Sequence, residues 1–203
     1  MDEIDKVFAA MGSALTRWSM VDRSLTMIYA VAVNPRKPAM AAASIWRVTG
    51  HSLKVEMTES ALEALFIEYE KGDPTAIRES WEKAKKSMSK AVKGRNDLGH
   101  SALYGVTTEG RRKSVLQKDR EKFRSLRQGR GQARFFDADY CKIIEHDCFI
   151  ANIDLIKILT PLDDFFRENR VVMREDDAFP ENMEEFFTRR NSRRRKARRA
   201  NRA

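Results

Sequence analysis

One feature of the sequence limits the fold more than any other: apolar residues recur every three or four positions over three long stretches. This spacing gathers them on one face of a helix, whereas a half-buried strand requires strict alternation. We therefore expect three long amphipathic helices. The expected core positions are Ile4, Phe8, Met11, Leu15, Trp18, Leu25, Tyr29 and Ala32 in the first; Ile77, Trp81, Ala84, Met88, Val92, Leu98 and Ala102 in the second; and Cys141, Ile144, Cys148, Ala151, Leu155, Ile158, Leu162 and Phe165 in the third.

Prolines and glycines set the expected helix boundaries. Asn34-Pro35 ends the first helix, because a residue before proline is pushed out of the helical region. Asp73-Pro74 begins a long helix that runs to about Leu103, with an acidic N-cap and proline at the first helical position. Two shorter helices lie between them, one over residues 40–48 and one ending near Gly72. We expect an all-α, antiparallel bundle of four to five helices over residues 1–168.

A basic insert separates the long helix from the last one, which begins after Asp137 and which Pro161 is expected to kink or break. The insert covers about residues 109–132, between possible short strands at 103–107 and 133–136, and is interpreted as a loop or irregular hairpin, with a possible helical turn within 115–126. Its cations are expected to hold nucleic acid through the phosphate backbone, although a solvated loop is the alternative. The predicted contacts are Arg111, Arg112, Lys113, Lys118, Arg120, Arg124 and Arg127.

The excess of basic over acidic residues that gives the net charge of +9 lies at the C-terminal end of the chain. Thr188–Ala203 contains nine basic residues and no acidic residue, which leaves 30 basic and 30 acidic residues in the remainder. We expect residues 169–203 to form an acidic linker and an arginine-rich, disordered tail. No run of about 18 apolar residues predicts a membrane span, and the acidic N-terminus does not resemble a secretory signal. Two helically spaced cysteines, Cys141 and Cys148, are expected to be reduced, in a cytoplasmic protein without a metal or cofactor.

Two polar residues interrupt the apolar stripes. Asp22 stands where the first helix should present a hydrophobe, and Arg95 lies on the stripe of the long helix, seven residues after Met88. A buried guanidinium needs a partner. The simplest interpretation is that the two helices pack together and that Asp22 pairs with Arg95, either to fix helix register or to orient the arginine in a cleft.

The residues that follow Arg95 favour function. Arg95-Asn96-Asp97-Leu98-Gly99-His100 combines a cation that can hold a phosphate with a histidine that can move a proton. Gly94 and Gly99 weaken a helix and would allow the close approach of another backbone or a ligand. Five residues separate Arg95 from His100, about 140° around a helix, so the two side chains would need a groove between helices to cooperate. Arginine, asparagine and histidine suffice for metal-free RNA cleavage, in which the 2′-OH attacks its own phosphate.

This hexapeptide resembles the Arg-x4–6-His signature of the HEPN superfamily, in the bacterial form in which asparagine follows the arginine. Trp18-Ser-Met-Val-Asp22-Arg23 is similar to the first helix of bacterial members. The resemblance implies a homodimer with a metal-independent endoribonuclease site, often in toxins controlled by an antitoxin or in phage-defence effectors. It implies that Arg95 and His100 are catalytic and Asn96 assists, with Asp22 and Asp97 in support. Ala102 stands where members regulated by adenylylation have tyrosine.

Two other functions stay open at this level. The chain could be a catalytically silent HEPN-like module that binds nucleic acid or a partner protein, although such modules typically lose one of the three motif residues, and all three are present here. A sequence-specific DNA-binding protein is less favoured, because no helix-turn-helix spacing is evident.

Overall fold

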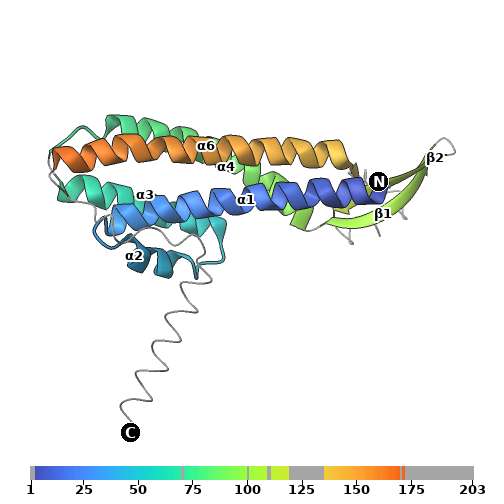
Figure 1. Cartoon of the computed structure of the whole chain (residues 1–203), viewed down its shortest axis with the longest axis horizontal. Helices are drawn as coiled ribbons and strands as arrows, with labels where there is room; N and C mark the ends of the chain where they lie inside the picture. The colour runs from blue at the N-terminus through green and yellow to red at the C-terminus, as the bar shows by residue number, and fades with distance from the viewer. Residues whose placement is uncertain are drawn as a thin grey trace, which may run out of the picture.

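A computed structural model describes residues 3–69, 71–99, 101–108, 111–118, 135–169 and 171. This part of the chain forms an all-α bundle, as the sequence predicts, in which the long helices lie along one common direction (Figure 1). None of its helices is long and apolar enough to cross a membrane. The helices are α1 (Glu3–Val33), α2 (Pro38–Ile45), α3 (His51–Glu68), α4 (Thr75–Gly99) and α6 (Ala138–Glu168).

A β-hairpin extends from one end of the bundle, directly after α4 (Figure 1). Strand β1 (Ser101–Thr108) pairs antiparallel with β2 (Arg111–Lys118), which pairs in turn with β3 (Phe135–Phe136). The hairpin alternative for the basic insert is therefore confirmed for its first part. The possible helical turn within 115–126 does not include residues 115–118, which belong to β2; residues 119–134 lie outside the described part.

Helix α6 forms the centre of the core, because it packs along both α1 and α4. All eight apolar positions predicted for it are buried. The expected break at Pro161 is wrong: α6 continues through it to Glu168. Both cysteines are unpaired and buried, and burial raises the pKa of each thiol to about 11.

The buried face of α4 follows the prediction for its first half and then shifts. Ile77, Trp81, Ala84 and Met88 are buried, but the stripe continues through Ala91, Gly94 and Leu98 instead of Val92 and Arg95. The shift occurs where α4 meets α6: a Cβ atom added at Gly94 would lie 2.6 Å from Cγ1 of Ile144. Because the glycine, one residue earlier, faces α6, Arg95 turns outward and is exposed. The prediction that Arg95 faces the core is wrong.

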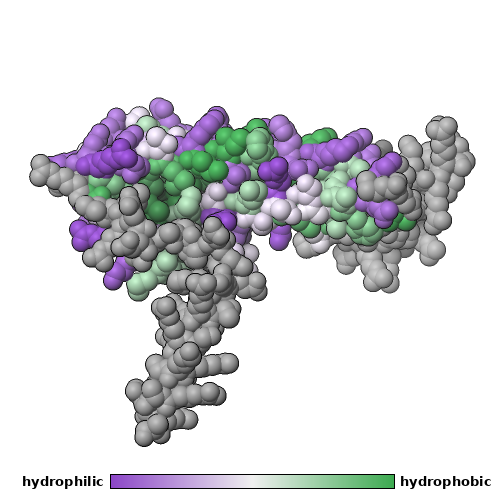
Figure 2. Space-filling model, in the orientation of Figure 1, coloured by the Kyte–Doolittle hydropathy of each residue, from purple (hydrophilic) through white to green (hydrophobic). Residues whose placement is uncertain are grey.

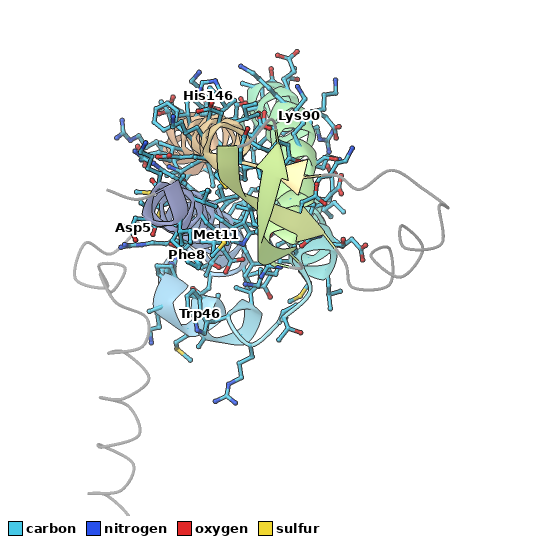
Figure 3. All side chains as sticks on the ribbon, turned by 90° about the vertical axis from the view of Figure 1, so that its right-hand side faces the viewer. Asp5, Phe8, Met11, Trp46, Lys90 and His146 are labelled. Atoms are coloured by element: carbon cyan, nitrogen blue, oxygen red, sulfur yellow. The ribbon has the colours of Figure 1, made fainter. Side chains whose placement is uncertain are left out.

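The buried face of α1 differs from the predicted stripe in the first part of the helix, whereas Leu25 and Ala32 are buried as predicted. Small and medium side chains face the core, among them Val7, Ala14 and Val21. Phe8, in contrast, is 49% exposed, and Ile4 and Leu15 are also exposed. Small residues at the contact let α6 approach closely, and the larger hydrophobes lie on an adjacent face of the helix. Figure 3 shows Phe8 and Met11 on the side of α1 away from α6.

The chain after α6 returns to the bundle over the few residues that the structure describes there. The side chain of Asn169 accepts a hydrogen bond from the backbone N–H of Lys71 and donates one to the Lys71 carbonyl. This contact lies beside Gly72, whose φ of +90° favours glycine. Val171 is 9% exposed and belongs to the core. The tail beyond, residues 172–203, lies outside the described residues.

Candidate functional site

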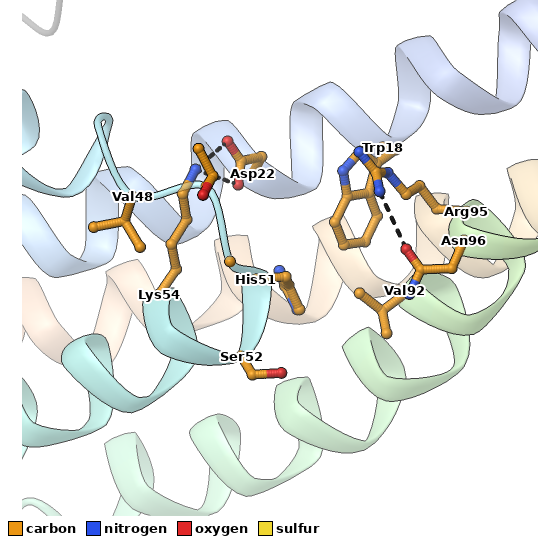
Figure 4. Close-up of a pocket in the computed structure, with 11 residues that line it drawn as sticks. Trp18, Asp22, Val48, His51, Ser52, Lys54, Val92, Arg95 and Asn96 are labelled. Atoms are coloured by element: carbon orange, nitrogen blue, oxygen red, sulfur yellow. Dashed lines mark hydrogen bonds and ion pairs between the residues drawn. The ribbon is translucent and has the colours of Figure 1, made fainter. Parts of the chain in front are cut away.

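A cavity of about 610 Å³ opens between α1, the start of α3 and the end of α4 (Figure 4). Each of the three elements contributes polar or aromatic side chains to it. Because α3 begins beside α1 and α4 ends beside it, the fold brings together residues more than seventy positions apart in the sequence. The residues that line the cavity are Trp18, Asp22, Val48, Thr49, Gly50, His51, Ser52, Lys54, Val92, Arg95 and Asn96.

The guanidinium of Arg95 is held at the edge of this cavity by an aromatic ring and an amide. Its Cζ lies 6.0 Å from the centre of the Trp18 ring, and its Nη1 donates a hydrogen bond of 3.1 Å to Oδ1 of Asn96. Among the described residues, no carboxylate forms an ion pair with Arg95. A cation oriented in this way, with hydrogen-bond donors to spare, is suited to binding an anion.

The predicted pair of Asp22 with Arg95 is wrong, although both residues line the cavity. Asp22 binds Lys54 instead: Nζ of Lys54 donates to Oδ1 at 2.8 Å and to Oδ2 at 2.7 Å. The lysine is buried, and its Nζ also lies 5.7 Å from the centre of the Trp46 ring. The acidic partner that we expected for the arginine therefore neutralises another cation, one that the apolar spacing of α3 did not single out.

His51 is the second residue of the cavity that the sequence did not reveal. It is the first residue of α3, and its ring meets the Trp18 ring edge-on, with centres 4.9 Å apart. Its Nδ1 is buried without a hydrogen-bond partner among the described residues. Burial lowers the pKa of His51, nearby Lys54 and Arg95 lower it further, and Asp22 opposes the shift. A lone histidine after glycine carries no motif, so no sequence signal identified it.

The N-terminus of α3, the positive end of its helix dipole, lies in the cavity wall. Gly50 is the N-cap and offers no side-chain oxygen to the first backbone N–H groups of the helix. These groups have no partner within the helix, and Gly50, His51 and Ser52 all line the cavity. The helix dipole therefore acts in the same direction as the charge of Arg95 and favours an anion here.

The other predicted site residues are distributed differently. Asn96 lines the cavity, but Asp97 is buried on another face of α4, where Oδ2 accepts a hydrogen bond of 3.1 Å from the Tyr140 hydroxyl. His100 lies outside the described residues. Of the predicted nucleic-acid contacts, Arg111, Arg112, Lys113 and Lys118 are in strand β2, whereas Arg120, Arg124 and Arg127 fall outside the described part.

Gly94, which precedes the motif, and Gly99, which belongs to it, have different environments. The close approach predicted at Gly94 is the packing of Ile144 against α4. A Cβ atom at Gly99 would meet no described atom within 4 Å. Gly94 therefore serves helix packing.

The arrangement as a whole unites a cation, an imidazole and an indole face around one cavity. Within the described ranges, no three His, Cys, Asp or Glu side chains are grouped as metal ligands would be. An anionic ligand with a flat, stackable group fits this chemistry. Comparison of the chain with protein-family models, with curated proteins and with solved structures found no match.

Proposed function

We propose that this protein is a metal-independent endoribonuclease of the HEPN type, acting at the cavity between α1, α3 and α4. The observation that carries the proposal is the position of Arg95, which lines the cavity with no carboxylate partner among the described residues. Its charge is available to a phosphodiester, and Trp18 beside it offers a ring on which a base can stack. The motif residues Asn96 and His100, which follow in the sequence, complete the chemistry that the HEPN resemblance implies.

The roles of the residues follow from the charges that develop during RNA cleavage. The attack of the 2′-OH on the phosphorus increases the negative charge on the phosphate oxygens, which Arg95 would stabilise. Asn96, hydrogen-bonded to Nη1 of Arg95, would orient the guanidinium. His100 would donate a proton to the leaving 5′ oxygen. Asp22 would act indirectly, by neutralising Lys54 in the cavity wall.

A homodimer is part of the proposal, and the exposed face of α1 supports it. Ile4, Phe8, Met11, Leu15 and Trp18 follow one another at spacings of four and three residues, the spacing of a coiled-coil seam. We name this set the α1 seam. Its first, second and fourth members are exposed, and Trp18 reaches the cavity. A second copy on the α1 seam would therefore lie beside the site.

The surface and the hairpin are consistent with a binding role. Figure 2 shows hydrophobic residues over the middle of α6 and over parts of α1. Phe149, Ile150 and Ile156 of α6 are exposed. Such a surface is suited to a protein partner, and we propose that this partner is an antitoxin or inhibitor.

Strand β2 follows α4 and β1 in the chain and begins with Arg111-Arg112-Lys113. We propose that this strand contacts the RNA backbone.

Cleavage of RNA in the presence of EDTA tests the proposed activity. We expect the wild-type protein to cut total RNA into products that end in a cyclic phosphate, and Arg95→Ala and His100→Ala to lose at least about 100-fold in rate. Lys90→Ala is the matched control, because Lys90 is an exposed cation of the same helix outside the cavity (Figure 3). RNA binding without cleavage by the wild type would contradict the proposal and support the silent binding module.

A toxin or phage-defence role has its own test. Expression of the wild-type protein should arrest growth, and His100→Ala should relieve the arrest if cleavage causes it. An equally toxic His100→Ala variant would separate any toxicity from RNA cleavage.

A further inference from the structure

The strongest unexplained feature of the cavity is His51, a histidine that is not part of the Arg-x4–6-His motif. We propose that His51 is the general base of the site, accepting the proton of the attacking 2′-OH when RNA occupies the cavity. This inference rests on the proposed function for its reaction and on the geometry of the described residues for its location. It adds a second proton-transfer group to a site for which the motif supplies only one histidine.

The position of His51 is fixed from two sides. The Trp18 ring packs against it edge-on, with centres 4.9 Å apart, and the backbone of the first turn of α3 carries it into the cavity wall. Arg95 contacts the same indole from the end of α4 (Figure 4). An anion held by Arg95 at this wall would therefore lie beside the imidazole.

The two ring nitrogens of His51 have different surroundings: Nδ1 is buried without a hydrogen-bond partner among the described residues, whereas Nε2 is not buried. A buried polar nitrogen without a partner destabilises the fold, and such atoms are rare in folded proteins. Here the atom belongs to a residue that lines a cavity large enough for a nucleotide. A hydroxyl group of the ligand could pair with Nε2, the ring nitrogen of His51 that is not buried.

The charges around His51 keep the ring neutral, as a base requires. Asp22 from α1 faces it with a negative charge, but Lys54 from α3 neutralises that carboxylate, and Arg95 from α4 adds a positive charge. Burial, Lys54 and Arg95 lower the pKa of His51 below its usual value of 6.5, against the opposing effect of Asp22. At neutral pH the imidazole is therefore free to accept a proton.

The step balances without any group from outside the proposed site. His51 takes the 2′-OH proton as the 2′ oxygen forms a bond to phosphorus, and the bond from phosphorus to the 5′ oxygen breaks. The 5′ oxygen leaves with a proton from His100, the acid of the proposed function. The products are a 2′,3′-cyclic phosphate and a 5′-hydroxyl, and the two histidines exchange protons with water before the next cycle.

The first experiment measures the pH dependence of RNA cleavage in EDTA for the wild type, His51→Gln and His146→Gln. His146 is the matched control, an exposed histidine of α6 away from the cavity (Figure 3). We expect His51→Gln to lose at least about 100-fold in rate and to lose the acidic limb of the profile, while His146→Gln keeps both. An active wild type matched by His51→Gln in rate and profile would overturn the inference alone; an inactive wild type would overturn the proposed function and this role with it.

The second experiment needs no cleavage and no variant in the site. The NMR signals of the histidine rings are followed against pH in the wild-type protein, with and without inorganic phosphate, and His146→Gln assists the assignment. Phosphate bound at Arg95 should raise the pKa of His51, whereas the ring signals of His146 should not respond to phosphate. A His51 signal that phosphate does not move, at concentrations that shift the backbone signals of Arg95, would place the ring away from the anion and overturn the inference.

Discussion

Lys54 is buried, and its Nζ donates hydrogen bonds to both carboxylate oxygens of Asp22, at 2.8 Å to Oδ1 and 2.7 Å to Oδ2. The pair joins α1 to the first turn of α3 and forms one wall of the cavity that contains His51 and Arg95. A buried ammonium is tolerated because its counter-ion is fixed at two oxygens. The pair therefore links the stability of the fold to the shape of the site.

Removing Asp22 should destabilise the protein more than removing an exposed carboxylate. Asp22→Ala leaves the buried Lys54 without a counter-ion, and we expect a loss of about 3 kcal/mol in the free energy of unfolding, measured by urea denaturation. Glu63→Ala is the control: it breaks the exposed pair with Arg78 and should cost less than about 1 kcal/mol. The double variant Asp22→Leu/Lys54→Met should recover much of the loss. Equal effects of Asp22→Ala and Glu63→Ala would refute the structural role of the pair.

Gly94→Ala should destabilise the bundle, although alanine favours a helix by about 1 kcal/mol. The new Cβ would lie 2.6 Å from Cγ1 of the buried Ile144, and overpacking of this kind costs about 1–3 kcal/mol. Gly12→Ala in α1 is the matched control, because a Cβ there meets nothing within 4 Å, and it should stabilise the protein. Thermal unfolding measures both variants. Ile144→Ala removes both Cγ atoms that the new Cβ would meet, so it should destabilise Gly94→Ala less than it destabilises the wild type, which an unrelated cause of instability would not allow.

The stability of the protein should fall as the pH drops through the titration of His51. Burial lowers the pKa of His51 in the folded protein, whereas in the unfolded chain it returns to about 6.5. Below that pH the unfolded chain binds a proton that the folded protein does not, so the contribution of neutral His51 is present above about pH 6.5 and is lost as the pH falls. Urea unfolding at pH 7.5 and 5.5 should show a smaller pH dependence in His51→Gln than in the wild type. His146→Gln should behave like the wild type; the same slope in all three proteins would be inconsistent with a buried, neutral His51.

Phe8→Glu should weaken self-association if the α1 seam is the dimer interface. Phe8 is 49% exposed in the single chain, and a charge at its position would have to be desolvated in a dimer. Sedimentation velocity should then show a shift from dimer toward monomer. Ile67→Glu, at an apolar residue of α3 that is 81% exposed and outside the α1 seam, should leave the dimer intact. A wild type that is monomeric at all accessible concentrations would remove the dimer from the proposed function.

The regular part of the fold could be predicted from local spacing. Every apolar position expected for α6 is buried, because that helix packs along both α1 and α4. The same rule failed for the first part of α1, where Val7, Ala14 and Val21 are buried in place of larger residues on a neighbouring face. Spacing identifies an apolar face, but when a helix has two, the partner helix decides which is buried.

Residue spacing and local motifs were enough to predict a helical bundle, a hairpin alternative for the basic insert and a hexapeptide with the residues for phosphate chemistry. The outward direction of Arg95 depends on helix packing, because Gly94 makes the contact with α6 one residue earlier. Helix packing also pairs Asp22 with Lys54 and brings His51 to the indole ring that Arg95 contacts. Local spacing orders side chains around one helix, whereas the partners of a charge depend on which helix ends meet, and those ends are far apart in the chain.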